Sequence, residues 1–182
     1  MSASIRDITY LLRQGHLIAL ADETGWSIVC DPINDSAVTE LLPFTASLPA
    51  YQRPTVIIQN TDQLVLYVAK VPEIAYDLVE FAENPLTVVY EQGKNVSPMI
   101  YASEESAAKT REIAVRRSLN TDIQRLIGGF GRGLLSIPLE SLQLPPAAND
   151  VIKERFGILP AMPRRSRIMQ LGTGGEVHFI RK

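Results

Sequence analysis

The sequence is poor in the residue types that hold metals and form disulfides. It has one cysteine, Cys30, and two histidines, His16 and His178. One cysteine excludes an internal disulfide, and so few ligands argue against a Cys/His zinc site. No apolar run approaches the roughly 20 residues that span a bilayer. The N-terminus is charged at Arg6 and Asp7, unlike a signal peptide. We therefore expect a cytoplasmic protein without an intrinsic metal.

The rest of the composition is typical of a globular protein. The chain has 182 residues, of which 46% are hydrophobic and 21% are charged. Both fractions are close to globular averages, and this length suits one domain with its own core. Because no repeat or linker interrupts the sequence, we expect residues 1–182 to form a single domain.

The spacing of apolar residues predicts helices and strands that alternate along the chain. Helices are expected over 5–13, 35–42, 122–127 and 151–156, with two more inside 61–81 that separate near Val71 and Pro72. Strands are expected over 16–21, 26–30, 55–59, 86–90, 113–116 and 134–137, and residues 166–171 and 177–181 are expected to form a hairpin. This order favours an α/β domain with a mixed sheet.

Charge is unevenly distributed along the chain. Residues 1–108 contain 5 basic and 14 acidic residues, whereas residues 109–182 contain 13 basic and 6 acidic residues. Arginine supplies 13 of the 18 basic residues, and its planar group of donors suits phosphate and carboxylate. Either the two halves neutralise each other across one fold, or the basic half forms a groove for a nucleotide or RNA.

The segment Ile18–Asp31 resembles the opening of the YrdC-like family, which includes threonylcarbamoyl-AMP synthases. That family reads P-T-(D/E)-T-(V/T)-Y-G after a helix that ends in glycine and a strand. Glu23 and Thr24 match the pattern, whereas Asp22 stands in place of the first threonine and Trp26 in place of the tyrosine. Further stretches resemble the family in the same order: Asn84–Val89, Ile113–Arg116, Gly133–Ser136, and Ser166–Leu171 followed by Arg181. The resemblance implies a single YrdC-like α/β domain, with a twisted mixed sheet, flanking helices and a concave ligand groove.

The sequence departs from the family where the family handles charge. Ala46-Ser47-Leu48 replaces the family's K-x-R, and Pro138-Leu139-Glu140 replaces its S-A-N. The family chemistry joins threonine, bicarbonate and ATP and releases pyrophosphate, so cations must neutralise the phosphates. The loss of these donors, with a carboxylate at Glu140, predicts weakened or lost synthase activity. Arg53 and Arg117 are the candidates to replace the missing cations.

The resemblance implies that ATP with Mg²⁺ is a ligand and that particular residues of this chain contact it. Thr24, Thr87, Arg116 and Ser166 match positions near the nucleotide or substrate. The alternative for each threonine is a turn cap or an ordinary strand position. Arg116 either grips a phosphate or carboxylate or is a partly exposed, solvated arginine at a strand end. Trp26 either stacks on an adenine or packs in the core. No catalytic residue is assigned.

The basic residues of the C-terminal half concentrate in two places. Arg117 follows Arg116, and Arg164, Arg165 and Arg167 form the densest cluster. This cluster either contacts RNA phosphates or is a solvated loop. The family's concave surface is associated with double-stranded RNA and tRNA. We therefore expect a divergent YrdC-like domain that binds a nucleotide, double-stranded RNA or tRNA, with weakened or lost synthase activity. The alternatives are an active synthase in tRNA threonylcarbamoyladenosine modification and a non-enzymatic protein-interaction domain.

Overall fold

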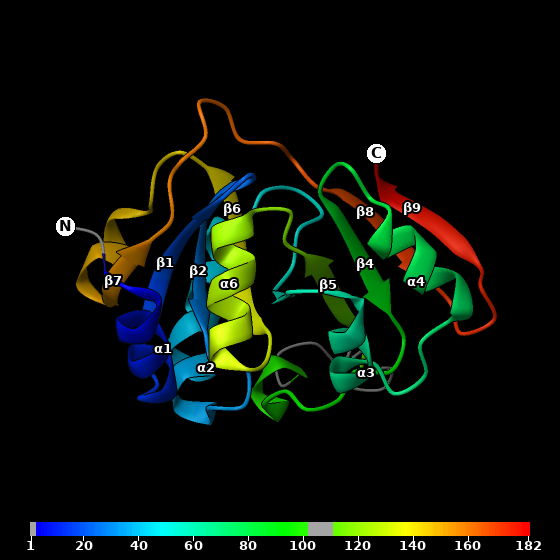
Figure 1. The fold of residues 1–182 in the computed structure, drawn as a ribbon, viewed down its shortest axis with the longest axis horizontal. Coiled ribbons are helices and arrows are strands. Elements are labelled where there is room, and N and C mark those ends of the chain that lie inside the picture. The colour runs from blue at the N-terminus through cyan, green and yellow to red at the C-terminus, as the bar shows by residue number, and fades with distance from the viewer. Residues whose placement is uncertain (1–2, 102–110) are drawn as a thin grey trace.

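A mixed β-sheet runs through the whole molecule (Figure 1). The computed structural model describes residues 3–101 and 111–182. Within these ranges nine strands form one sheet in the order β7-β1-β2-β6-β3-β5-β4-β8-β9. The strands are β1 (Leu17–Asp22), β2 (Gly25–Cys30), β3 (Thr55–Ile58), β4 (Leu86–Tyr90), β5 (Ile113–Arg117), β6 (Leu134–Ser141), β7 (Ile152–Phe156), β8 (Arg167–Leu171) and β9 (Val177–Arg181).

Short helices connect these strands and cover the sheet. The α-helices are α1 (Ile5–Arg13), α2 (Asp35–Leu41), α3 (Leu64–Tyr67), α4 (Glu73–Glu80) and α6 (Thr121–Phe130). Helix α1 begins with a capping box, in which Ser4 Oγ accepts from the Asp7 N–H at 3.1 Å and Asp7 Oδ2 accepts from the Ser4 N–H at 3.3 Å. Helix α6 ends at Gly131, whose φ of 90° suits glycine. No helix in the described ranges is long and apolar enough to cross a membrane.

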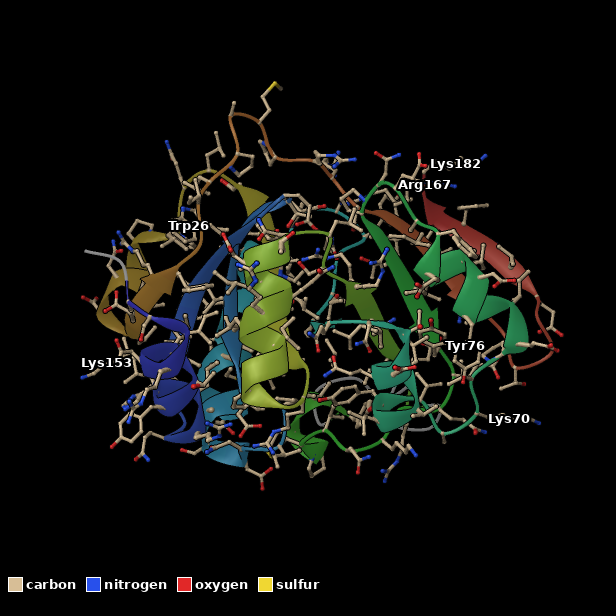
Figure 2. The ribbon with its side chains drawn as sticks, in the orientation of Figure 1. Trp26, Lys70, Tyr76, Lys153, Arg167 and Lys182 are labelled. Carbon is tan, nitrogen blue, oxygen red and sulfur yellow. The ribbon has the colours of Figure 1, made fainter. Side chains whose placement is uncertain are left out.

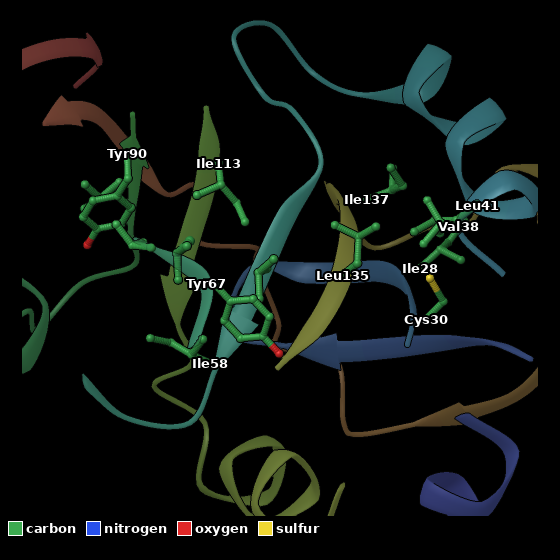
Figure 3. Close-up of a cluster of buried hydrophobic side chains, with 14 of the residues drawn as sticks. Ile28, Cys30, Val38, Leu41, Ile58, Tyr67, Tyr90, Ile113, Leu135 and Ile137 are labelled. Carbon is green, nitrogen blue, oxygen red and sulfur yellow. The ribbon is translucent and has the colours of Figure 1, made fainter. Parts of the chain in front are cut away.

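The sheet buries apolar side chains on both of its faces. On one face, Ile8 of α1 and Leu126 of α6 pack with Ile18 and Leu20 of β1. The opposite face carries a larger cluster, which includes Cys30 (Figure 3). Because neighbouring residues of a strand face opposite sides, β1, β2, β3 and β6 each contribute to both clusters. The fully buried Cys30 is a small core residue, as Figure 3 shows.

The arrangement confirms most of the predicted elements and corrects one. Two helices lie within 61–81, and the C-terminal hairpin is formed by β8 and β9. The prediction of a helix over 151–156 is wrong, because residues 152–156 form β7, which pairs in parallel with β1. Strand β7 is an edge strand whose centre, Lys153 to Arg155, is exposed. Three consecutive polar residues hide the alternation that is typical of a strand. A segment this short does not distinguish a helical period from a strand period.

Candidate functional site

Charged and polar side chains gather where several strands end. Asp22 ends β1, Arg116 lies near the end of β5, and Ser166 directly precedes β8. Residues 157–166 cross from β7 to β8 along the top of Figure 1, above the end of β1 and the start of β8. Arg116 pairs in register with Ile57, which packs in the apolar cluster under α1 and α6. We call the following residues the charged cluster: Asp22, Glu23, Arg116, Glu140, Ser166 and Arg181.

Arg116 is buried and held by two carboxylates. Its Nη2 lies 2.8 Å from Asp22 Oδ2, and its Nη1 lies 3.0 Å from Glu23 Oε1. The exposed fractions of the three side chains are 2%, 0% and 11%, respectively. Burial alone would lower the pKa of the guanidinium, but the negative charges of Asp22 and Glu23 outweigh it and raise that pKa. The expectation of a partly exposed arginine at a strand end is therefore wrong.

The turn between β1 and β2 positions both carboxylates. Asp22 Oδ1 accepts from the Thr24 N–H at 2.8 Å and from Thr24 Oγ1 at 2.7 Å. Glu23 Oε1 also accepts from the Leu119 N–H at 3.0 Å. Thr24 is buried, and its two donor groups fix the Asp22 carboxylate, which caps this turn. The chain thus supplies the ion partners of Arg116 from residues adjacent in sequence.

Glu140 enters the charged cluster through a bulge in β6. Opposite β2, Trp26 pairs with Ser141 but Ser27 pairs with Pro138, so Leu139 and Glu140 are extra residues. Glu140 has a φ of 52°. A left-handed backbone conformation destabilises a residue such as glutamate by about 1 kcal/mol or more. Surrounding contacts must therefore hold Glu140 in place.

The Glu140 carboxylate accepts two charge-assisted hydrogen bonds. The Ser166 N–H donates to Glu140 Oε2 at 2.8 Å, and Arg181 Nη2 donates to the same oxygen at 2.6 Å. The Glu140 side chain is 1% exposed. Its Oε1 has no hydrogen-bond partner within the described ranges, and Arg165 Nε lies 4.0 Å away. The Glu140 carboxylate therefore accepts the hydrogen bonds of donors that face the interior of the charged cluster.

Ser166 joins several elements at the cluster. Its Oγ lies 3.0 Å from Thr87 Oγ1 on β4, and Gln52 Nε2 donates to it at 3.2 Å. The Ser166 carbonyl accepts from Arg181 Nε at 3.1 Å. Thr87 pairs in register with Arg116, so both residues belong to the same region. Gln52 was not found from the sequence because it lies in a loop without a recognisable motif.

The other expected site residues lie outside the buried interior of the charged cluster. Trp26 is partly buried and packs against the larger apolar cluster. Arg117 donates to the carbonyls of Val79 and Glu80 at the end of α4, both at 3.1 Å. The three residues of the dense basic cluster are exposed: Arg164, Arg165 and Arg167. The structure thus brings Thr24, Thr87, Arg116 and Ser166 together and separates them from Trp26 and Arg117.

The register of β3 and β5 separates Arg53 from Arg117. Thr55 pairs with Ala114, and Ile58 pairs with Arg117. Arg53 therefore lies beyond one end of the paired strands and Arg117 at the other end. Arg53 Nη1 instead lies 3.9 Å from Glu112 Oε1. The two arginines cannot together replace one neighbouring pair of cations.

The residues of the charged cluster do not fit a triphosphate. Its three carboxylates, Asp22, Glu23 and Glu140, outnumber its two guanidinium groups, Arg116 and Arg181. Each guanidinium already contacts a carboxylate, so a polyanionic ligand would meet repulsion and no unpaired cation inside the cluster. Within the described ranges, no group of three or more His, Cys, Asp or Glu residues is placed to hold a metal ion.

Known proteins resemble the chain in sequence. A family model named for Sua5, YciO and YrdC, and described as "Telomere recombination", matches residues 10–159. The threonylcarbamoyl-AMP synthase of Photobacterium profundum is 27% identical over 177 residues, which are 95% of this chain and 89% of that protein. The synthase of Pseudoalteromonas translucida is 30% identical over 128 residues, which are 69% of this chain and 65% of that protein.

Solved structures share the fold. The crystal structure of E. coli YciO aligns with a TM-score of 0.73 at 18% identity, over 98% of this chain and 88% of that one. The crystal structure of P. abyssi Sua5 complexed with L-threonine aligns with a TM-score of 0.73 at 20% identity, over 97% of this chain. The chain spans only 53% of that Sua5 structure. These likenesses confirm the expected mixed sheet with flanking helices.

Proposed function

The chain belongs to the Sua5/YciO/YrdC family, and from this premise we propose that it is a divergent YrdC-like domain that binds RNA and has weakened or lost threonylcarbamoyl-AMP synthase activity. We take residues 1–182 as one domain of a cytoplasmic protein. The observation that carries the loss of synthase activity is the pairing of Arg116 with Asp22 and Glu23 at 2.8 and 3.0 Å. An arginine engaged in this way is not available to ATP phosphates.

Glu140 supports the same conclusion. It stands where the family resemblance places the amide of S-A-N, and it engages Arg181 at 2.6 Å. A buried carboxylate raises the energy of any anion brought beside it. Adenylate formation needs donors and cations that stabilise charge on the departing pyrophosphate. In the charged cluster, carboxylates instead neutralise the positive charges of Arg116 and Arg181.

The exposed arginines support RNA binding. Arg164 and Arg167 are exposed, and the Arg165 side chain is 60% exposed. The Arg167 guanidinium carbon lies 5.2 Å from the centre of the Phe179 ring, which is itself 39% exposed. Cations beside an accessible aromatic ring suit a phosphate backbone and an unstacked base. Figure 2 shows Arg167 and Lys182 at the end of the sheet near the C-terminus.

RNA binding is tested by fluorescence anisotropy with duplex RNA and with tRNA over a range of salt concentrations. We expect the parent protein to bind both with little sequence preference and with affinity that falls steeply as salt rises. Replacing Arg164, Arg165 and Arg167 by alanine should weaken binding and reduce the salt slope by about one for each lost phosphate contact.

A matched triple variant controls for net charge. It replaces Lys70, Arg125 and Lys153, which are exposed on other parts of the surface (Figure 2 labels the two lysines). This variant removes the same charge and should bind RNA almost as the parent does. If both triple variants lose the same RNA affinity, the loss reflects net charge and not contacts made by Arg164, Arg165 and Arg167. No binding by the parent at low salt would refute the RNA proposal.

An active synthase is the second candidate function. It is favoured by the sequence similarity to threonylcarbamoyl-AMP synthases over 95% of the chain. Thr87, Arg116 and Ser166, which match family positions near the ligand, also lie together in the structure. On this reading, ATP with Mg²⁺ would have to displace the carboxylates from Arg116. Direct measurement of pyrophosphate release separates the two candidates.

A further inference from the structure

We propose that the Glu140 carboxylate is the chain's own occupant of an anion-binding site formed by the Ser166 N–H and the Arg181 guanidinium. Without that carboxylate, the site would take a small tetrahedral anion of the phosphate class. Glu140 thus determines the ligand class of the charged cluster, because it excludes phosphate-bearing ligands. The inference rests on the same charged cluster as the proposed loss of synthase activity, but it is tested without ATP turnover and without RNA.

The donors around Glu140 form a built site. The Ser166 N–H and Arg181 Nη2 converge on a single oxygen, at 2.8 and 2.6 Å. The side chains of Glu140 and Arg181 are 1% and 10% exposed. A backbone N–H and a guanidinium that converge in a protected place are the donors with which proteins bind phosphate and carboxylate.

Contacts that do not involve Glu140 hold these donors in position. Arg181 Nε donates to the Ser166 carbonyl at 3.1 Å, and Arg181 Nη1 donates to the Ala50 carbonyl at 3.4 Å. Ser166 Oγ is fixed by Thr87 Oγ1 at 3.0 Å and by Gln52 Nε2 at 3.2 Å. The donors should therefore keep their arrangement when the carboxylate is removed, and an external anion can then meet a preorganised site.

The backbone of Glu140 points to a specific role for its side chain. Its φ of 52° lies in the left-handed region, inside a bulge that interrupts the pairing of β6 with β2. A residue with a bulky side chain keeps such a conformation only when its contacts hold it there. Glycine fits the same backbone without strain. Glu140→Gly therefore removes the carboxylate, leaves space beside Arg181 and suits the local fold.

Isothermal titration calorimetry with inorganic phosphate, at constant ionic strength, tests the proposal. We expect Glu140→Gly to bind one phosphate about tenfold or more tightly than the parent, as two charge-assisted hydrogen bonds would provide. Glu140→Gln should resemble the parent, because its amide oxygen still fills the position. Adding Arg181→Gln to the glycine variant should abolish the gained binding.

The exposed Glu154 of β7 provides the control for net charge. Glu154→Gln removes one negative charge without touching the cluster, and its phosphate binding should equal that of the parent. The proposal is overturned if folded Glu140→Gly binds phosphate no more tightly than the parent. It is also overturned if the gained binding survives the loss of Arg181. Since no ATP is present, neither result depends on synthase activity.

Thermal unfolding keeps the test decisive if the glycine variant is unstable. Phosphate should raise the melting temperature of Glu140→Gly relative to sodium chloride at equal ionic strength, and it should leave the parent unchanged, because a ligand stabilises the state that binds it. Glu140→Asn, which also tolerates a left-handed backbone, should respond in the same direction. If neither variant folds at any phosphate concentration, the proposal is wrong, because an external anion cannot replace the carboxylate.

Discussion

Arg116 and Asp22 form a buried ion pair although they are separated by 94 positions in the sequence. Arg116 Nη2 lies 2.8 Å from Asp22 Oδ2, and both side chains are almost fully buried. Asp22 is itself anchored by the Thr24 N–H and hydroxyl, so the pair is fixed from both sides. A charge pair of this kind holds the end of β1 against β5 and leaves the arginine engaged within the protein.

Removal of the Arg116 side chain should strongly destabilise the fold. Arg116→Ala leaves Asp22 and Glu23 buried without their cation, which typically costs about 3–5 kcal/mol. The measurement is the free energy of unfolding in urea. Arg125 on α6 is the matched control, because its side chain is 69% exposed and lies 3.7 Å from Asp122. Arg125→Ala should change stability by less than about 1 kcal/mol. An Arg116→Ala protein as stable as the parent would contradict the buried pair.

Gly25 should be intolerant of any side chain. Its φ is 102°, and a Cβ at this position would lie 2.6 Å from the Ser141 carbonyl oxygen, beside the bulge that carries Glu140. Gly175 has a φ of 90° but no atom within 4 Å of such a Cβ. Gly175→Ala should cost about 1–2 kcal/mol from backbone strain alone. Gly25→Ala should cost roughly 1–3 kcal/mol more because of the clash. Equal unfolding free energies for the two variants would show that β2 and β6 do not pack this closely.

Cys30 should be unreactive in the folded protein. Burial raises the pKa of its thiol, and the neighbouring charge of Asp31 adds to that effect. The nucleophile is the thiolate, which this environment suppresses. Alkylation by iodoacetamide near neutral pH should therefore be slow in the native state and fast in denaturant. Rapid labelling of the native protein would show that the core around Cys30 opens readily.

Stability should fall at alkaline pH because of Tyr67. Burial raises the pKa of its phenol from 10.0 to about 12, while the Gly133 N–H donates to its oxygen at 2.8 Å. The folded state favours the neutral phenol, so this contribution is complete below pH 10 and is lost as pH rises from 10 toward about 12. The unfolding free energy should decline by up to about 1.4 kcal/mol per pH unit from this group. Tyr67→Phe should decline less steeply in the same titration, and an equal slope would contradict the assignment.

The sequence predicts the parts of the fold that have strong apolar periodicity. The helix with Ile8 and Leu12 on one face and the buried strand around Leu20 are found as expected. Strand β7 was missed because Lys153 and its polar neighbours hide the strand period at the sheet edge. Local patterns dominate such predictions, and an edge strand owes its conformation to a partner that is distant in sequence.

The resemblance predicts which residues lie close together better than it predicts their contacts. Arg116 and Ser166 were found by resemblance, and the structure places both in the charged cluster. Each was expected to face a ligand, whereas Arg116 faces Asp22 and Glu23. A sequence gives the number of charges but not their pairing, because pairing depends on strand register and on bulges. The bulge at Glu140 has no recognisable local signal.

The most direct test of the central claim is a synthase assay. The purified protein is mixed with ATP, Mg²⁺, threonine and bicarbonate, and both pyrophosphate and the adenylate product are measured. The synthase of Photobacterium profundum serves as the positive control under the same conditions. We predict a turnover at least about 100-fold below that control, because one preorganised donor alone is worth about 10²–10³ in rate and Arg116 and Arg181 are both engaged by carboxylates. A rate within about tenfold of the control would contradict the account and show that ATP displaces the internal carboxylates.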